Sequence, residues 1–224
     1  VGAIRRLSYV VYTSETNAFL AQLPLIQEKV VDILRSSPAD LVHAEVYLCM
    51  RVFLCRFASQ HLTGFWPIIL TEMVRILAQA KVDLPADKSD RLQLVFSVVK
   101  LADFLITLQT DDFQIHQWLL ITDTPDATNP ASSYMADSLL DCLAKFVSEC
   151  QRELVFDAND SLERAQQRRP LLQMSSVATI STLQPFFATA SRAFYQCDFH
   201  ATLDWDNINA CLLHDLFEPI HTNT

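Results

Sequence analysis

The stretch that decides the fold runs from Asp40 to Ala58 and reads DLVHAEVYLCMRVFLCRFA. Its apolar residues occupy nearly the whole circumference of a helix instead of one stripe. A helix that is apolar all round belongs in the middle of a protein, so we predict that this segment is a central, buried helix. The arginine inside it, Arg51, then needs either a buried partner or a route to the surface.

The composition around this segment also favours helices. The chain has 224 residues, of which 50% are hydrophobic and only two are glycine. Sheet proteins use glycine in hairpins and bulges, whereas glycine inside a helix costs about 1 kcal/mol relative to alanine. We therefore predict one all-α domain over residues 1–224. Its helices are arranged either as a degenerate HEAT- or armadillo-like repeat stack or as a globular helical bundle.

Apolar residues at three- and four-residue spacing mark about eight helices, or nine when the short first segment is counted, and prolines mark the corners between them. Pro67 is predicted in the first turn of a helix, and Pro24 is predicted to kink or split another. The predicted helices are 4–13, 17–35, 40–58, 65–80, 89–109, 112–121, 133–155, 172–197 and 206–217. The polar stretch 156–170 is predicted to be an exposed connector.

Charge and motifs exclude several classes of function. The net charge is −9, which argues against nucleic acid as a partner because duplex binding requires a basic face. The sequence has no phosphate-binding loop and no recognisable nucleophile motif, so we expect neither catalysis nor a cofactor. No segment is apolar and long enough to span a bilayer. Six cysteines without a CxxC pair indicate a reduced, cytosolic compartment.

One acidic pair is a candidate catalytic motif. Asp111 and Asp112 resemble the metal-binding aspartates of all-α isoprenoid synthases. Such a site needs further carboxylates one turn later, where this chain has Ile115 and His116. A capping box formed by Asp111 and Gln114 explains the pair better.

Charged residues inside apolar helices predict a buried ion pair. Arg51 lies in one such helix, and Lys100 and Asp103 lie one turn apart in another. Buried charges must be paired. We predict that Asp103 is the partner of Arg51, with Glu72 as the second choice. We expect Arg51→Ala to be strongly destabilising.

Two basic clusters are candidates for contact with anionic lipid. One consists of Arg5 and Arg6, and the other of Arg164, Arg168 and Arg169. Each cation near an anionic membrane contributes about 1 kcal/mol. An ordinary solvated surface is the alternative explanation for each cluster.

One sequence block resembles a known family. The segment RVFLCRFASQHLTGFWP, Arg51 to Pro67, resembles the C-terminal region of the Dopey family. Further blocks in the same order are 100–103, Gln117–Trp118, 171–172 with 183–187, and 214–218. The stretch 122–168 shows no match.

The resemblance implies a fragment of a very large peripheral membrane protein of endosomes and the Golgi, located on their cytosolic faces and acting in membrane traffic. The implied partners are a large scaffold related to Arf exchange factors and a phospholipid flippase of the type IV P-type ATPases. No catalytic residues are implied. The family blocks are expected to determine the fold, with Trp66 and Trp118 as core anchors and Arg51 and Asp103 as buried partners.

Two functions remain open. The domain is either a protein-interaction and assembly module, which would use an apolar groove or a self-associating helix such as Leu139 to Leu154, or a module that binds anionic phosphoinositides through a basic patch. The acidic net charge favours protein interaction.

Cys197-x-x-His200 and Cys211-x-x-His214 are the sharpest metal-like pattern, because four nitrogen or sulfur ligands suit structural zinc. Cys211 and His214, however, lie among leucines on a predicted helix. We therefore predict that no metal is bound. Elemental analysis of protein purified without chelator or metal-affinity resin should find far less than stoichiometric zinc, and near-stoichiometric zinc would contradict this prediction.

Overall fold

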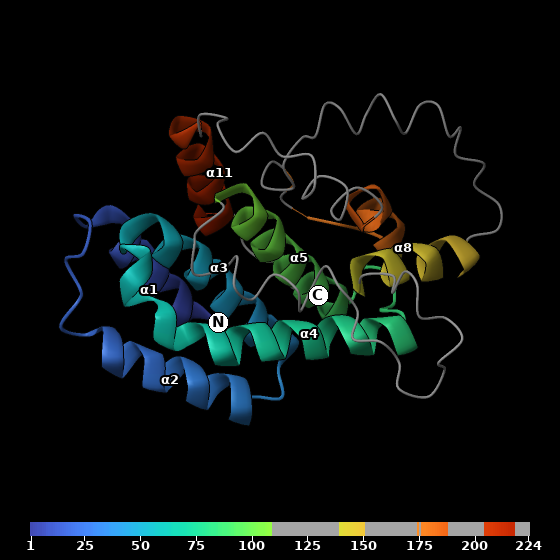
Figure 1. Ribbon diagram of the computed structural model, residues 1–224, viewed down its shortest axis with the longest axis horizontal. Coiled ribbons are helices and arrows are strands. Elements are labelled where there is room, and N and C mark those ends of the chain that lie inside the picture. Colours follow the sequence, from blue (N-terminus) through green and yellow to red (C-terminus); the bar gives the residue numbers. More distant parts are fainter. Residues whose placement is uncertain (109–138, 151–173, 175, 188–203, 218–224) are drawn as a thin grey trace.

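The computed structural model describes residues 1–108, 139–150, 174, 176–187 and 204–217 (Figure 1). Within these ranges every regular element is a helix, which confirms the all-α prediction. The α-helices are α1 (Gly2–Thr13), α2 (Leu23–Ser36), α3 (Asp40–Arg56), α4 (Trp66–Val82), α5 (Asp90–Leu108), α8 (Leu139–Cys150) and α11 (Trp205–Phe217). Short 3₁₀ turns are η1 (Ser59–His61), η2 (Thr63–Phe65) and η5 (Ile180–Leu183).

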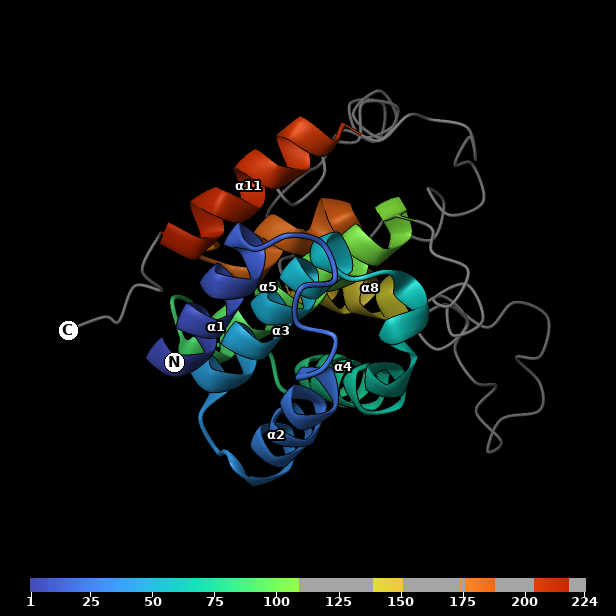
Figure 2. The ribbon, with the colours of Figure 1, turned by 90° about the vertical axis from the view of Figure 1, so that its left-hand side faces the viewer.

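Helix α3 is the centre of the described structure, as its sequence predicts. Every residue from His43 to Leu54 is buried. Helices α1, α2, α5 and α11 all pack against α3, as Figures 1 and 2 show from two directions. Because α3 is covered on so many sides, it has no polar face, and its charged residues must find partners inside the protein.

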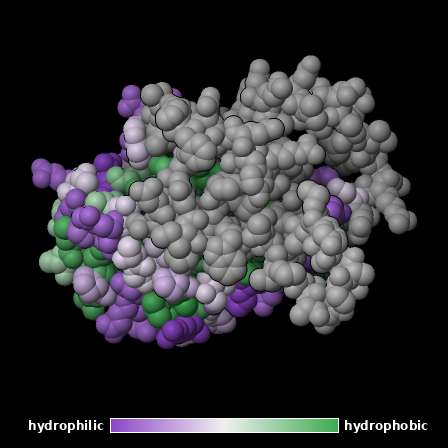
Figure 3. All heavy atoms as spheres, in the orientation of Figure 1, coloured by the Kyte–Doolittle hydropathy of each residue, from purple (hydrophilic) through white to green (hydrophobic). Residues whose placement is uncertain are grey.

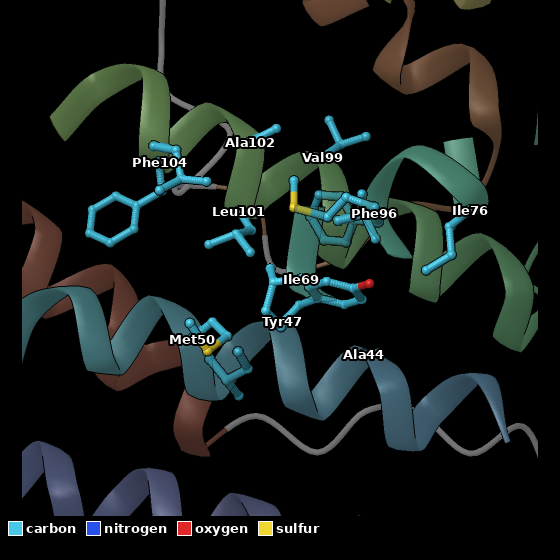
Figure 4. Close-up of a cluster of buried hydrophobic side chains, with 14 of the residues drawn as sticks. Ala44, Tyr47, Met50, Ile69, Ile76, Phe96, Val99, Leu101, Ala102 and Phe104 are labelled. Atoms are coloured by element: carbon cyan, nitrogen blue, oxygen red, sulfur yellow. The ribbon is translucent and has the colours of Figure 1, made fainter. Parts of the chain in front are cut away.

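Helix α5 forms the other half of the core. It makes its most extensive contacts with α3, and its residues from Val98 to Ile106 are all buried. Figure 4 shows Tyr47 and Met50 of α3 facing Leu101 of α5, with Ile69 of α4 close by. Burial of a side chain of this size contributes about 1.5–3 kcal/mol. The α3–α5 contact therefore buries much of the apolar core of the described helices.

The corner after α3 is held by aromatic residues. Phe53 makes edge-to-face contacts with Phe57 and Phe65, at centroid distances of 5.3 and 5.8 Å. Trp66, predicted as a core anchor, is 1% exposed. Pro67 lies at the start of α4, where its missing N–H costs no helical hydrogen bond.

Two predicted boundaries were wrong. Helix α2 begins at Leu23, because residues 17–22 form turns, and Pro24 lies in its first turn instead of producing a kink. The reason is local. Asn17 has a positive φ of 64°, its N–H donates to the Arg56 carbonyl at 2.8 Å, and its Oδ1 accepts from Ala58 N at 3.1 Å. These bonds attach the turn to the end of α3.

The second wrong boundary lies in the predicted helix 172–197. Residues 176–179 are not helical, and the helical part starts only with η5 at Ile180. The predicted helix 112–121, Trp118 and the basic residues 164, 168 and 169 lie outside the described residues.

The apolar face of α8 is not free for self-association. Leu139, Leu140, Leu143 and Val147 are buried, and the helix packs against α4 and η5. A self-association role for this face is therefore incompatible with its position in the core; Leu154 lies outside the described residues. Among the described helices, none combines the length and the apolar character that crossing a membrane would require.

Candidate interaction surface

A buried charge cluster joins α11 to the two core helices. One oxygen of Asp215, Oδ2, accepts a hydrogen bond from Arg51 Nη1 and another from Lys100 Nζ, each at 2.6 Å. Lys100 Nζ also donates to the Met174 carbonyl at 2.5 Å. The side chain of Arg51 is 4% exposed, that of Lys100 is 2% exposed and that of Asp215 is 8% exposed. The cluster is therefore almost completely removed from water.

The structure corrects the predicted partner of Arg51. Arg51 is buried and ion-paired as expected, but the carboxylate is that of Asp215 and not that of Asp103. Asp103 is fully buried on α5, and the second choice, Glu72, pairs with Arg75 at 2.7 Å. Asp215 belongs to a sequence block that the family resemblance marked, yet sequence reasoning assigned it no role.

The spacing of residues in α11 explains why Asp215 reaches the cluster. Ile208, Leu212 and Leu216 are buried, at steps of four residues, so they form one stripe of the helix. Asp215 lies next to that stripe, seven residues after Ile208. The same face therefore carries apolar contacts and one carboxylate into the protein.

The position of Lys100 shifts its acid–base equilibrium. Burial, followed by the nearby Arg51 charge, lowers the pKa of Lys100 from 10.5 to about 8, against the opposing effect of Asp215. The ammonium also lies 5.2 Å from the ring centroid of Phe96. The buried position of Lys100 therefore disfavours its charged form.

Helix α1 is held on α3 by a second buried pair. Arg5 binds Glu45 in a bidentate manner, with Nη2–Oε1 at 2.6 Å and Nε–Oε2 at 3.1 Å. The Glu45 side chain is fully buried. Arg5, predicted as a possible lipid contact, is therefore committed to this pair, while Arg6 is exposed.

Helices α1 and α11 lie side by side (Figure 2). The Tyr12 hydroxyl donates to the Asn209 carbonyl at 3.1 Å. Tyr9 and Phe217 meet edge to face, with centroids 5.5 Å apart. The residue pairs 9–217 and 12–209 show that the two helices run antiparallel.

Both helices of this contact carry exposed apolar residues. We define the α1–α11 ridge as Tyr9, Val10, Leu213 and Phe217, whose side chains are 43%, 46%, 39% and 65% exposed. Scattered exposed apolar residues are normal, but two adjacent helices that both present them form a candidate contact site for a protein. On the face shown in Figure 3, the described surface mixes hydrophilic and hydrophobic residues.

The cysteine thiols near these elements are poor nucleophiles. Burial raises the pKa of both Cys49 and Cys55 to about 12. Burial and the Asp215 carboxylate raise the pKa of Cys211 as well. These thiols stay protonated at neutral pH, which disfavours thiolate chemistry and metal ligation. No group of three metal-ligating side chains occurs within the described ranges, and Cys197 and His200 lie outside them.

A surface pocket of about 920 Å³ lies between the end of α4 and the start of α5. Its charges largely satisfy one another. Arg91 Nη1 contacts Asp40 Oδ1 at 3.3 Å, and both Arg91 and Arg75 donate to the side-chain oxygen of Gln79. With Asp83 also in its wall, the pocket presents no excess of either charge.

The chain is similar in sequence to a known protein family. Residues 1–199 match the family model described as DOP1 C-terminal, which confirms the resemblance. The chain is 28% identical to protein DOP1B of Mus musculus over 225 residues, covering 85% of this chain and 10% of that protein. It is 31% identical to protein pad-1 of Caenorhabditis elegans over 160 residues, covering 66% and 7%.

The protein DOP1 homolog of Drosophila melanogaster is 38% identical over 91 residues, covering 40% of this chain and 4% of that protein. The chain therefore spans a tenth or less of the length of these relatives. No solved structure matches it.

We predict that Asp215→Asn lowers the free energy of unfolding by about 3–5 kcal/mol, because it leaves two buried cations without their carboxylate. Arg51→Met should cost less, since Lys100 still neutralises Asp215. The control is Asp206→Asn, an exposed residue in the first turn of α11, which should change stability by at most about 1 kcal/mol. Urea unfolding of all four proteins measures this order, and equal stability of the two aspartate variants would refute it.

We also predict a pH dependence from Lys100. Its folded pKa lies below its unfolded value, so the unfolded chain binds more protons between pH 8 and 10.5 and stability rises with pH there. The cost of burying the charge is fully present below pH 8 and is relieved above 10.5, a change on the order of 3 kcal/mol.

Lys100→Met removes this titration. The difference in unfolding free energy between wild type and Lys100→Met should shift in favour of wild type as the pH rises from 8 to 10. Taking the difference cancels the titration of groups that both proteins share. A difference that is constant with pH would contradict the assignment.

Proposed function

This chain belongs to the DOP1 C-terminal family, and from that premise we propose that it is a non-enzymatic interaction domain of a peripheral membrane protein in endosome–Golgi vesicle traffic. The family resemblance supports two partners, a large scaffold related to Arf exchange factors and a type IV P-type ATPase flippase. The corresponding location is the cytosolic face of Golgi and endosome membranes. Because the relatives are far longer, this domain supplies one contact among several.

The observation that carries the proposal is the α1–α11 ridge. Its aromatic members, Tyr9 and Phe217, contact each other edge to face with centroids 5.5 Å apart, and both remain exposed. Aromatic side chains of this kind dominate the energetics of protein interfaces. The ridge combines exposed apolar side chains with an aromatic contact between two helices, which suits recognition of another protein.

Direct binding of anionic lipid is the alternative function. It needs several cations on one surface, each contributing about 1 kcal/mol. In the N-terminal cluster, Arg5 is engaged by Glu45, and Arg6 is exposed. The net charge of −9 opposes long-range attraction to an anionic membrane. The structure thus gives the protein-interaction function more support than the lipid function.

Variants on the ridge test the proposal. We predict that Tyr9→Ser with Phe217→Ser weakens binding of the full chain to the Arf-exchange-factor-like scaffold by at least about tenfold, because truncated hot-spot residues cost about 2 kcal/mol or more. The matched control is Leu25→Ser with Val82→Ser, which changes two exposed apolar residues on α2 and α4. The control should bind like wild type in calorimetric titrations.

Equal binding by the ridge and control variants would refute the role of the ridge. The lipid alternative is tested by flotation with vesicles of phosphatidylcholine containing phosphatidylserine and phosphatidylinositol 4-phosphate. We expect the chain to stay unbound. Salt-sensitive flotation that Arg6→Ala abolishes would favour the lipid function instead.

A further inference from the structure

The surface beneath α11 is chemically unusual. Helices α1, α3 and α5 and Met174 surround the inner face of α11, and two of the groups that face it are cationic, Arg51 of α3 and Lys100 of α5. Two buried cations require a carboxylate, because an uncompensated buried charge is strongly unfavourable. This groove, which we call the α11 groove, therefore selects for an apolar helix that carries an acidic residue.

Helix α11 satisfies this groove incompletely. The Nε of Arg51 is buried and has no hydrogen-bond partner within the described part of the chain. A carboxylate that contacted both Nε and Nη1 would satisfy the guanidinium better, since bidentate pairing is the stronger arrangement. The apolar seal is also modest. Helix α11 buries Ile208, Leu212 and Leu216 but leaves larger side chains such as Trp205 and Phe217 exposed.

We propose that the α11 groove is a receptor for an acidic amphipathic helix of a partner protein, and that α11 occupies it as an exchangeable internal ligand. The recognised pattern is the one that α11 itself displays. Counted from Ile208, a second apolar residue follows four positions later, an acidic residue seven positions later and a third apolar residue eight positions later. Helix-in-groove binding through such spacing is a common mode of peptide recognition.

Exchange would couple two surfaces of the protein. A helix that enters the groove displaces α11, and with α11 go Leu213 and Phe217, half of the α1–α11 ridge. Binding at the groove and binding at the ridge are then mutually exclusive, since each requires a different position of α11. The inference goes beyond the proposed function, because the groove is defined by Arg51 and Lys100, which contact Asp215 and are not part of the ridge.

The test uses the full 224-residue chain and two fluorescein-labelled peptides spanning residues 204–217. One has the native sequence, and the other carries Asp215→Asn. The Asp215→Asn chain, whose own helix is weakly held, should bind the native peptide at least about tenfold more tightly than the substituted peptide. It should also bind the native peptide more tightly than the wild-type chain does, because the wild-type α11 competes. Fluorescence anisotropy measures both comparisons.

Equal binding of the two peptides, or no binding of either, would overturn the proposal. If the Asp215→Asn chain does not fold, Leu212→Ala replaces it, since this change weakens the apolar seal of α11 and keeps the ion pairs. A wild-type dimer that the native peptide dissociates, detected by light scattering, would assign the groove to a second copy of this chain and overturn the assignment to a partner protein. The two proposals can fail separately, because they are measured in different experiments. The ridge variants retain Asp215 and test scaffold binding, whereas the peptide titrations test the groove.

Discussion

The single oxygen of Asp215 that receives both Arg51 and Lys100 is the interaction on which the arrangement depends. Helices α3 and α5 are apolar nearly all round, so they form a stable core but leave two cations with no route to water. Helix α11 brings the missing charge from 164 residues away in the sequence. Its own apolar stripe is narrow, and the ion pairs make its position specific. The placement of α11 beside α1 in turn creates the exposed ridge.

The sequence predicted much of this fold because local signals and packing agree. The apolar circumference of 40–58 predicted a central helix, and Pro67 correctly marked the first turn of α4. Prediction failed where a distant contact decides a local structure. Asn17 forms a turn because the Arg56 carbonyl accepts a hydrogen bond from its N–H and the Ala58 N–H donates one to its side chain. Residues 176–179 are not helical, and there the Ala178 carbonyl accepts a hydrogen bond from the distant Lys88 N–H at 3.0 Å. Spacing alone could show that Arg51 needs a carboxylate, but only the three-dimensional arrangement identifies Asp215 instead of Asp103.

The candidate site was less predictable than the fold. Arg5 and Arg6 look equivalent in the sequence, yet one is engaged by the buried Glu45 and the other is exposed. The leucines of 139–147 looked available for self-association, yet α4 and η5 cover them. Which apolar face of a helix stays exposed depends on which other helices cover it. The sequence pattern shows that a helix is amphipathic but does not show which elements pack against it. The ridge emerges only when α1 and α11 are placed together.

The central claim is that α11 is held through a direct charge interaction between Arg51 and Asp215. A double-mutant cycle with Arg51→Met, Asp215→Asn and the double variant, followed by urea unfolding at pH 7, measures that interaction separately from the other effects of each substitution. The account predicts a coupling energy of at least about 1.5 kcal/mol, as found for close buried charge pairs. Additive effects of the two substitutions would show that the residues act independently and would contradict the account.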